Sequence, residues 1–157
     1  VIRQKTASLI ASCCACGASS SGADAETVKK LHTFGEKIGI AFQIKDDLFD
    51  FGIDDVGKPL GNDIKEKKMT LPLIYALNQS DKSEKRRIIN LVKNHSEDNK
   101  KVAEVIAFVR QSGGLEYATE KMLDYQKDAF KILDEFPDNE YKTGLLQLVK
   151  FKTERKK

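Results

Sequence analysis

Three aspartates with D-D-x-x-D spacing form the group in this sequence best suited to chemistry. Asp46, Asp47 and Asp50 lie within a segment whose apolar pattern predicts a helix. At about 100° per residue from Asp46, Asp50 falls at about 40° and Asp47 at about 100°. The amide of Gln43 falls at about 60° on the same wheel. The three carboxylates and the amide are therefore predicted to share one helix face.

The chemistry of this face follows from its charge. Like charges at this spacing repel one another unless a cation lies among them. A hard divalent ion suits such oxygen ligands, and Mg²⁺ is usually held by one or two carboxylates together with substrate phosphate oxygens and water. The motif therefore indicates a Mg²⁺-bridged phosphate ester. The alternative is a solvated acidic turn, which the motif alone would favour.

The surrounding sequence favours an interior cavity. The helix that carries the motif is rich in apolar residues, namely Ile38, Ile40, Ala41, Phe42, Ile44, Leu48, Phe49 and Phe51. Lys58 and Lys68 follow the motif, and lysines beside a Mg²⁺ site can neutralise a diphosphate. Both also correspond to ordinary surface lysines. Lys5, at the edge of an apolar stripe, either extends to water or points into a shared polar cavity.

The elements that would position these groups are all predicted to be helices. Apolar residues recur at i, i+3, i+4 and i+7, as in Val102, Val105, Ile106 and Val109, and no segment alternates as a strand would. The predicted helices span residues 1–18, 24–51, 70–79, 83–95, 98–112, 115–136 and 138–153, with Asp24 as an N-cap, a loop from Gly52 to Gly61, and a start for the last helix at Pro137-Asp138. The sequence predicts one all-α domain of antiparallel helices over residues 1–157.

Composition excludes several classes of function. The chain has 157 residues, of which 40% are hydrophobic and 32% charged, which is typical of a soluble domain. No apolar run approaches the ~18 residues of a membrane span, and no signal peptide pattern is present. The net charge of +3 and basic runs without aromatic residues give no indication of nucleic-acid binding. A chain that starts at Val1 rather than Met is expected to be a fragment or a processed product.

Three clustered cysteines call for a separate interpretation. Cys13, Cys14 and Cys16 are too few and too close for a disulfide framework, and only His32 and His95 could complete a zinc site. Their small neighbours predict a closely packed helix in which the cysteines serve packing. Reduced cysteines suit the cytoplasm.

The order of these motifs resembles that of the trans-type polyprenyl (isoprenyl) diphosphate synthase family. Residues 42–50 resemble its second aspartate-rich motif, and residues 57–59 and 61–72 resemble the segment that follows it. Residues 5–9 resemble its Lys-Thr motif, and residues 145–155 its final helix. The likeness runs from end to end. It implies the C-terminal half of the isoprenoid synthase fold, most similar to the long-chain bacterial octaprenyl-type enzymes.

The resemblance implies a Mg²⁺-dependent prenyltransferase that condenses isopentenyl diphosphate with an allylic diphosphate. In that chemistry Mg²⁺ helps the allylic diphosphate leave, the double bond of isopentenyl diphosphate attacks the carbocation, and a proton is lost. By position, Asp46 is implied as the main Mg²⁺ ligand, with Asp47 and Asp50 acting through water or in support. The other implied roles are diphosphate contacts from Lys5, Lys58 and Lys68, oxygen dipoles near the cation from Thr6 and Gln43, and support of metal-bound waters or Lys68 by Asp63.

The resemblance also implies that part of the active site lies elsewhere. The family's first aspartate-rich motif and its Gly-Lys-Arg segment precede the Lys-Thr motif, and here only four residues precede Lys5. Asp54-Asp55 is no substitute, because no further carboxylate follows at the required spacing. This chain is therefore expected to hold about half of the active site and to be inactive alone. The full-length protein is expected to be a cytoplasmic homodimer without nucleic-acid partners, making a long-chain product for quinone side chains.

Two other functions stay open. The chain could belong to a non-catalytic regulatory or partner subunit of a prenyl synthase, although such a subunit would be expected to lose its aspartates. It could also belong to a terpene cyclase on the same fold. The Lys-Thr motif and the run from Gly57-Lys58-Pro59 to Thr70-Leu71-Pro72 favour chain elongation over cyclisation.

Overall fold

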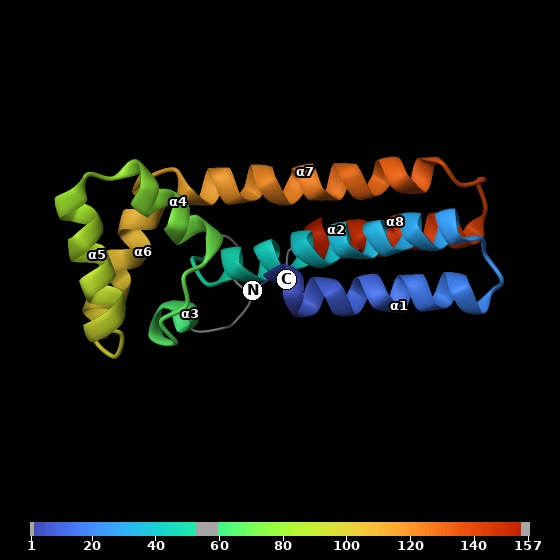
Figure 1. The fold of residues 1–157 in the computed structure, drawn as a ribbon. Coiled ribbons are helices and arrows are strands. Elements are labelled where there is room, and N and C mark those ends of the chain that lie inside the picture. The colour runs from blue at the N-terminus through green and yellow to red at the C-terminus, as the bar shows by residue number, and fades with distance from the viewer. Residues whose placement is uncertain (1, 53–59, 155–157) are drawn as a thin grey trace. The chain divides into compact units, whose positions relative to one another are not determined.

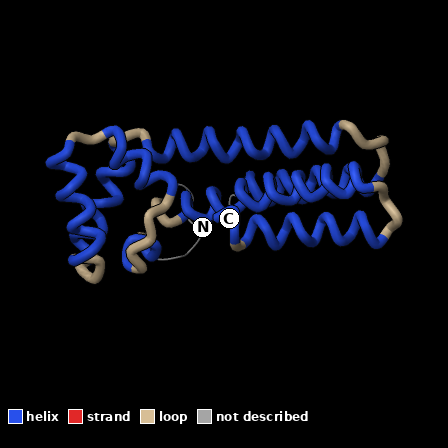
Figure 2. The backbone as a smooth tube through the Cα atoms, viewed as in Figure 1, coloured by secondary structure: helices blue, strands red, loops and turns tan. Residues whose placement is uncertain are grey.

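The computed structural model describes residues 2–52 and 60–154, and within these ranges the regular structure is helical, without a strand. Figure 2 shows this helical trace. In chain order the elements are a 3-10 helix η1 (Ile2–Gln4), then α1 (Thr6–Ser20), α2 (Ala25–Phe49), α3 (Asn62–Lys65), α4 (Leu71–Gln79), α5 (Lys82–Asn94), α6 (Asn99–Gln111), α7 (Gly114–Asp134) and α8 (Glu140–Glu154). The predicted all-α class is confirmed.

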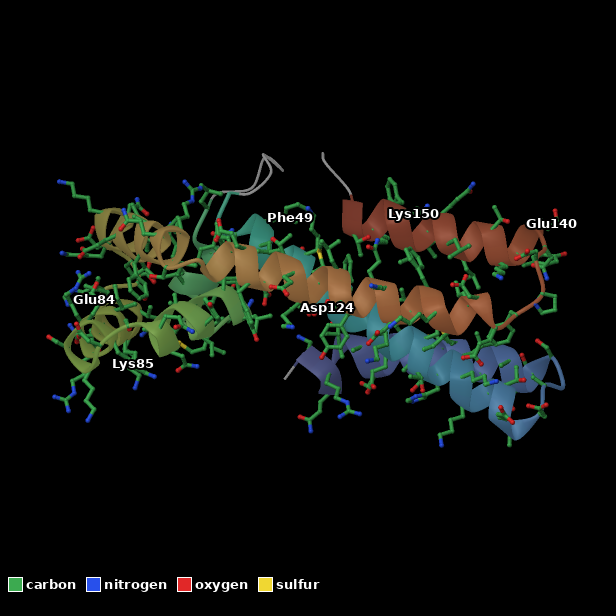
Figure 3. All side chains as sticks on the ribbon, turned by 90° about the horizontal axis from the view of Figure 1, so that it is seen from above. Phe49, Glu84, Lys85, Asp124, Glu140 and Lys150 are labelled. Atoms are coloured by element: carbon green, nitrogen blue, oxygen red, sulfur yellow. The ribbon has the colours of Figure 1, made fainter. Side chains whose placement is uncertain are left out.

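The chain divides into two compact units. The described residues up to Lys45 and from Lys121 onward form the first unit, and those between Asp46 and Glu120 form the second. In the first unit α1, α2, the later part of α7 and α8 run alongside one another (Figure 1). Its core contains Phe34 from α2, Ala129 and Leu133 from α7, and Val149 from α8. Figure 3 shows the side chains along α8, where Glu140 is the first residue and Lys150 lies in the C-terminal half.

Close contact between α1 and α2 depends on small residues. A Cβ added to Gly39 would lie 2.5 Å from the Cα of Ala7, and one added to Gly35 would lie 2.8 Å from the Cα of Ala11. Both alanines are fully buried. The two helix backbones therefore approach closely because α2 lacks side-chain carbons at these points.

This contact corrects the interpretation of the cysteines. A closely packed helix was predicted from the small residues around them, with the cysteines serving that packing. Instead Cys13 and Cys16 are exposed and only Cys14 is partly buried. Cys14 does serve packing: it lies against the core of the first unit and shares its face of α1 with the buried Ala7, Ala11 and Ala18. The predicted packing role is therefore confirmed for the small residues and for Cys14, and it is wrong for Cys13 and Cys16.

The second unit holds α3 to α6. Helix α6 packs against α3, α4 and α5, and its buried stripe contains the predicted Val102, Val105, Ile106 and Val109. Each of the helices α5 and α6 begins at an aspartate cap. The carboxylate of Asp81 accepts the backbone N–H groups of Ser83 and Glu84, and that of Asp98 accepts those of Lys100 and Lys101.

Most predicted helix boundaries lie within about two residues of those observed, and the differences have local causes. Asp24 caps α2 as predicted, since its carboxylate accepts the Thr27 N–H at 2.7 Å. Helix α1 begins only at Thr6, because Lys5 has a non-helical backbone that separates it from η1. Helix α8 starts after Asn139, whose side-chain oxygen accepts the Lys142 N–H at 2.8 Å, rather than at Pro137-Asp138. Helix α3 was not predicted.

Candidate active site

The acidic motif lies at the C-terminal end of α2. Asp46 and Asp50 line a cavity of about 260 Å³ together with Phe49 of the same helix. The remaining lining residues follow in the next part of the chain, namely Asn62, Asp63, Glu66 and Lys68. The structure therefore brings two motif aspartates together with Asp63 and Lys68, all within the second unit.

Asp50 holds the start of α3. One carboxylate oxygen accepts the Asn62 N–H at 2.7 Å and the other accepts the Asp63 N–H at 3.0 Å. The Asp50 carbonyl accepts the Gly61 N–H at 3.0 Å. A carboxylate at unsatisfied helix N–H groups is favourable both as a hydrogen-bond acceptor and as a charge. Asp50 thus fixes where Asp63 enters the cavity.

Lys68 is held near the motif by two carboxylates. Its Nζ lies 3.0 Å from Asp63 and 2.6 Å from Glu66. These partners raise the pKa of Lys68 above its ordinary value, so it stays cationic. The turn that presents it depends on Lys67, whose φ of 58° is left-handed. The Lys68 N–H then returns to the Asp63 carbonyl at 2.8 Å, as in a helix C-terminal cap.

Charge accumulates around the motif. Burial raises the pKa of Asp47 to about 7, and the neighbouring carboxylates of Asp63 and Asp46 add to the rise. The backbone N–H of Leu71 and the charge of Lys68 oppose it. Burial, followed by Asp63, also raises the pKa of Asp50, against the N–H groups that it accepts. The site therefore carries more negative charge than its own cation offsets, which favours a bound positive ion.

The donor chemistry of this cavity fits Mg²⁺. Within residues 2–52 and 60–154 no three His, Cys, Asp or Glu side chains converge as a complete metal cage. Mg²⁺ rarely uses such a cage, because it retains waters and binds through one or two carboxylates plus phosphate oxygens. Asp46, Asp50 and Asp63 supply hard oxygen donors beside a cationic Lys68. This arrangement is therefore suited to a cation that arrives with a phosphate-bearing molecule.

The other predicted site residues belong elsewhere in the chain. Lys5 is exposed just before α1, Thr6 is the first residue of that helix, and both lie in the first unit. Gln43 is partly buried on α2, about one turn before Asp46 and Asp47. Lys58 lies outside the described residues.

Residues missed by the sequence reasoning include Asn62, Glu66 and Arg110. Asn62 and Glu66 line the cavity, and a Gly-Asn-Asp run after a loop was a recognisable helix start that could have indicated them. The guanidinium of Arg110 donates two hydrogen bonds to the Phe51 carbonyl. Its only signal in the sequence was a basic residue in the last turn of α6.

The helical fold is that of the isoprenoid-building enzymes, and the sequence comparison agrees. The family described as polyprenyl synthetase matches residues 1–109, and the chain belongs to this family. The family predicted from the motif order is thereby confirmed.

Particular relatives show the range of this likeness. The chain is 36% identical over 157 residues to a short chain isoprenyl diphosphate synthase of Methanothermobacter thermautotrophicus, covering 99% of this chain and 48% of that protein. It is 34% identical to the nonaprenyl diphosphate synthase of Mycobacterium tuberculosis, covering 99% of this chain and 47% of that protein. The chain spans about half the length of the curated relatives it matches.

Solved structures agree with the fold. The crystal structure of a geranylgeranyl pyrophosphate synthase from Bacteroides thetaiotaomicron matches with a TM-score of 0.89 and 40% identity, covering 98% of this chain and 51% of that one. The crystal structure of a heptaprenyl diphosphate synthase from Staphylococcus aureus matches with a TM-score of 0.88 and 33% identity. The match covers 99% of this chain and 49% of that one. In the described part of the chain, no helix combines the length and apolar character needed to cross a membrane.

Proposed function

We propose that this chain is the C-terminal helical part of a prenyltransferase that condenses isopentenyl diphosphate with an allylic diphosphate to form a polyprenyl diphosphate. Membership of the polyprenyl synthetase family supports the reaction class. The observation that carries the proposal is the cavity where Asp46, Asp50, Asp63 and Lys68 meet. It combines oxygen donors for a hard cation with a cation for a phosphate, which is the pairing that a metal-diphosphate substrate requires.

The residues divide the work by their chemistry. Asp46 and Asp50 would hold Mg²⁺, with Asp47 as a supporting carboxylate beside them. Lys68 would contact the diphosphate, and Asp63 would orient Lys68 through their 3.0 Å ion pair. Lys5, Lys58, Thr6 and Gln43 complete the proposed set. Mg²⁺ in this site would stabilise the charge that develops on the departing diphosphate.

The reaction itself is a substitution at carbon. The bond between the allylic carbon and the diphosphate oxygen breaks, and the double bond of isopentenyl diphosphate forms the new carbon–carbon bond. Loss of a proton restores a double bond. Positioning the leaving diphosphate against Lys68 is the contribution of this part of the chain.

We further propose a long-chain product for quinone side chains, a homodimeric complete protein and a cytoplasmic location. Long-chain enzymes are among the relatives, since nonaprenyl and heptaprenyl diphosphate synthases match over most of this chain. Chromatography of the extracted products would test the chain length, and a product of four or fewer isoprene units would contradict it. Light scattering of the complete protein would test the dimer.

An assay with labelled isopentenyl diphosphate, farnesyl diphosphate and Mg²⁺ tests the proposed activity. We expect turnover by the complete polypeptide and none by residues 1–157 alone. In the complete protein, Asp46→Ala should lower turnover about a hundred-fold. Asp134→Ala removes an exposed aspartate of α7 as the matched control and should leave turnover unchanged.

Two outcomes would contradict the proposal. Turnover by residues 1–157 alone would show that the active site is complete in this chain. Full turnover after the double change Asp46→Ala with Asp47→Ala would favour a non-catalytic subunit instead.

A further inference from the structure

The turn that follows the acidic motif is attached to a helix distant in sequence. Phe51 is fully buried directly after Asp50, in the turn that follows Phe49, the last residue of α2. The Arg110 guanidinium of α6 reaches this carbonyl with Nη2 at 2.6 Å and Nε at 3.1 Å. A cation at the C-terminal end of a helix is also favoured by the helix dipole.

The local backbone is shaped to admit this guanidinium. Gly52 has a φ of +74°, and a Cβ at this position would lie 2.7 Å from Arg110 Nη2. At the far side of the loop, a Cβ at Gly61 would lie 2.3 Å from Val102 Cγ1. Val102 and Arg110 are eight residues apart on α6, which places them about two turns apart on one face. A single helix face therefore contacts both Gly52 and Gly61.

These contacts lead directly to the site. Arg110 fixes the Phe51 carbonyl, Asp50 precedes Phe51, and the Asp50 carboxylate holds Asn62 and Asp63. Asp63 in turn holds Lys68. Each step is a hydrogen bond or a peptide link, so loss of the first contact would displace the others.

We propose that Arg110 is a positioning residue for the acidic motif: its guanidinium fixes the turn after Asp50, and thereby the carboxylates and the lysine that receive the metal and the diphosphate. This inference rests on the proposed function. Arg110 acts through the Phe51 carbonyl and does not itself need to touch substrate.

The test compares Arg110→Ala and Arg110→Lys in the complete protein, with Arg86→Ala as a control that removes an exposed arginine of α5. Mn²⁺ uptake in the presence of inorganic diphosphate is followed by electron paramagnetic resonance, which detects the free ion. We expect Arg110→Ala to weaken Mn²⁺ uptake about ten-fold, as loss of an outer partner of metal ligands does. Arg110→Lys retains the charge but lacks the two N–H groups of the guanidinium fork. Its Mn²⁺ uptake should therefore lie between that of Arg110→Ala and that of the wild type.

Two further readouts separate positioning from general stability. Added guanidinium ion should restore Mn²⁺ uptake to Arg110→Ala, while having no effect on Arg86→Ala. In turnover assays, Arg110→Ala should raise the Mg²⁺ concentration for half-maximal rate about ten-fold and leave the KM for isopentenyl diphosphate unchanged.

The outcomes distinguish this inference from the proposed function. Equal Mn²⁺ uptake by folded Arg110→Ala and by the wild type would overturn the proposed role of Arg110 and leave the proposed function standing. Arg110→Ala that unfolds while Arg110→Lys binds Mn²⁺ as wild type does would also overturn it, because the role would then be structural. No uptake by the wild type would overturn the proposed function, and the inference with it.

Discussion

Replacing Gly61 with alanine should destabilise the second unit. The structure separates the expected cost into a backbone contribution and a steric contribution. Gly61 has a φ of +80°, a left-handed conformation that costs a residue with a Cβ about 1–2 kcal/mol. The new Cβ would also lie 2.3 Å from Val102 Cγ1, and Val102 is 4% exposed. Overpacking of this kind costs about 1–3 kcal/mol. The expected loss in the free energy of unfolding is therefore about 2–5 kcal/mol for Gly61→Ala.

Gly22 provides a matched control for the backbone contribution. Its φ of +78° is nearly the same, but nothing lies within 4 Å of its Cβ position. Gly22→Ala should therefore cost only about 1–2 kcal/mol. Any effect of glycine on the unfolded chain is common to both variants and cancels in the comparison. The measurement is urea unfolding of the 157-residue chain followed by far-ultraviolet circular dichroism.

A double-mutant cycle isolates the steric part. In a Val102→Ala background, which removes the clashing methyl, the cost of Gly61→Ala should fall to the 1–2 kcal/mol or so of the backbone alone. If Gly61→Ala is no more destabilising than Gly22→Ala, or if Val102→Ala does not reduce its cost, then α6 does not constrain the loop end as we argue.

Three other substitutions probe local features of the chain. Lys67→Gly should be neutral or stabilise by about 0.5–1 kcal/mol in urea unfolding, because Lys67 occupies a left-handed conformation with a φ of 58°; a loss of stability would show that the lysine side chain contributes more than the backbone strain. Asp98→Ala should lower the free energy of unfolding by about 1 kcal/mol, because it removes the cap of α6. Asp98→Asn should retain most of the capping stability, and an equal loss from both variants would contradict the cap. Backbone N–H donation by Thr27 lowers the pKa of Asp24, so this cap stabilises the folded chain above the unfolded pKa of about 3.9, and its contribution is lost as pH falls through the folded pKa. In thermal unfolding across pH, Asp24→Asn should therefore be less sensitive to acid than the wild type, and identical profiles would refute the cap.

Helix positions could be predicted from the sequence where the signal was local. Asp24 combines a capping side chain with a following apolar period, and both are properties of adjacent residues. The stripe of Val102, Val105, Ile106 and Val109 is buried as the period required. The carboxylate cluster could also be predicted from the sequence, because helical spacing alone places Asp46 and Asp50 on one face.

Features that depend on distant residues could not be predicted in the same way. Which of the three cysteines packs could not be read from α1 alone, because Gly35 and Gly39, on another helix, decide which of its residues approach closely. Helix α3 has only four residues, too few for a period. Its Gly-Asn-Asp start is recognisable in the sequence, but the carboxylate that holds this start lies twelve residues earlier. Arg110 contacts a carbonyl 59 residues away. No pattern in the neighbouring sequence encodes either contact.

Asp50 shows why substitution of a motif aspartate needs a structural control. Both of its oxygens already accept backbone N–H groups, from Asn62 and Asp63. Asp50→Ala should therefore lose two hydrogen bonds worth about 1 kcal/mol each, even without any metal. Asp50→Asn keeps one acceptor oxygen and should lose about half as much.

Amide hydrogen exchange measures this role directly. We expect the Asn62 and Asp63 amides to exchange about five-fold faster or more in Asp50→Ala, with a smaller change in Asp50→Asn. Asp46→Ala, at the exposed edge of the same cavity, should leave both rates unchanged. Unchanged exchange in Asp50→Ala would refute the proposed hold on α3. Faster exchange would mean that lost activity in an Asp50 variant reflects displaced Asp63 and Lys68 as well as any lost metal ligand.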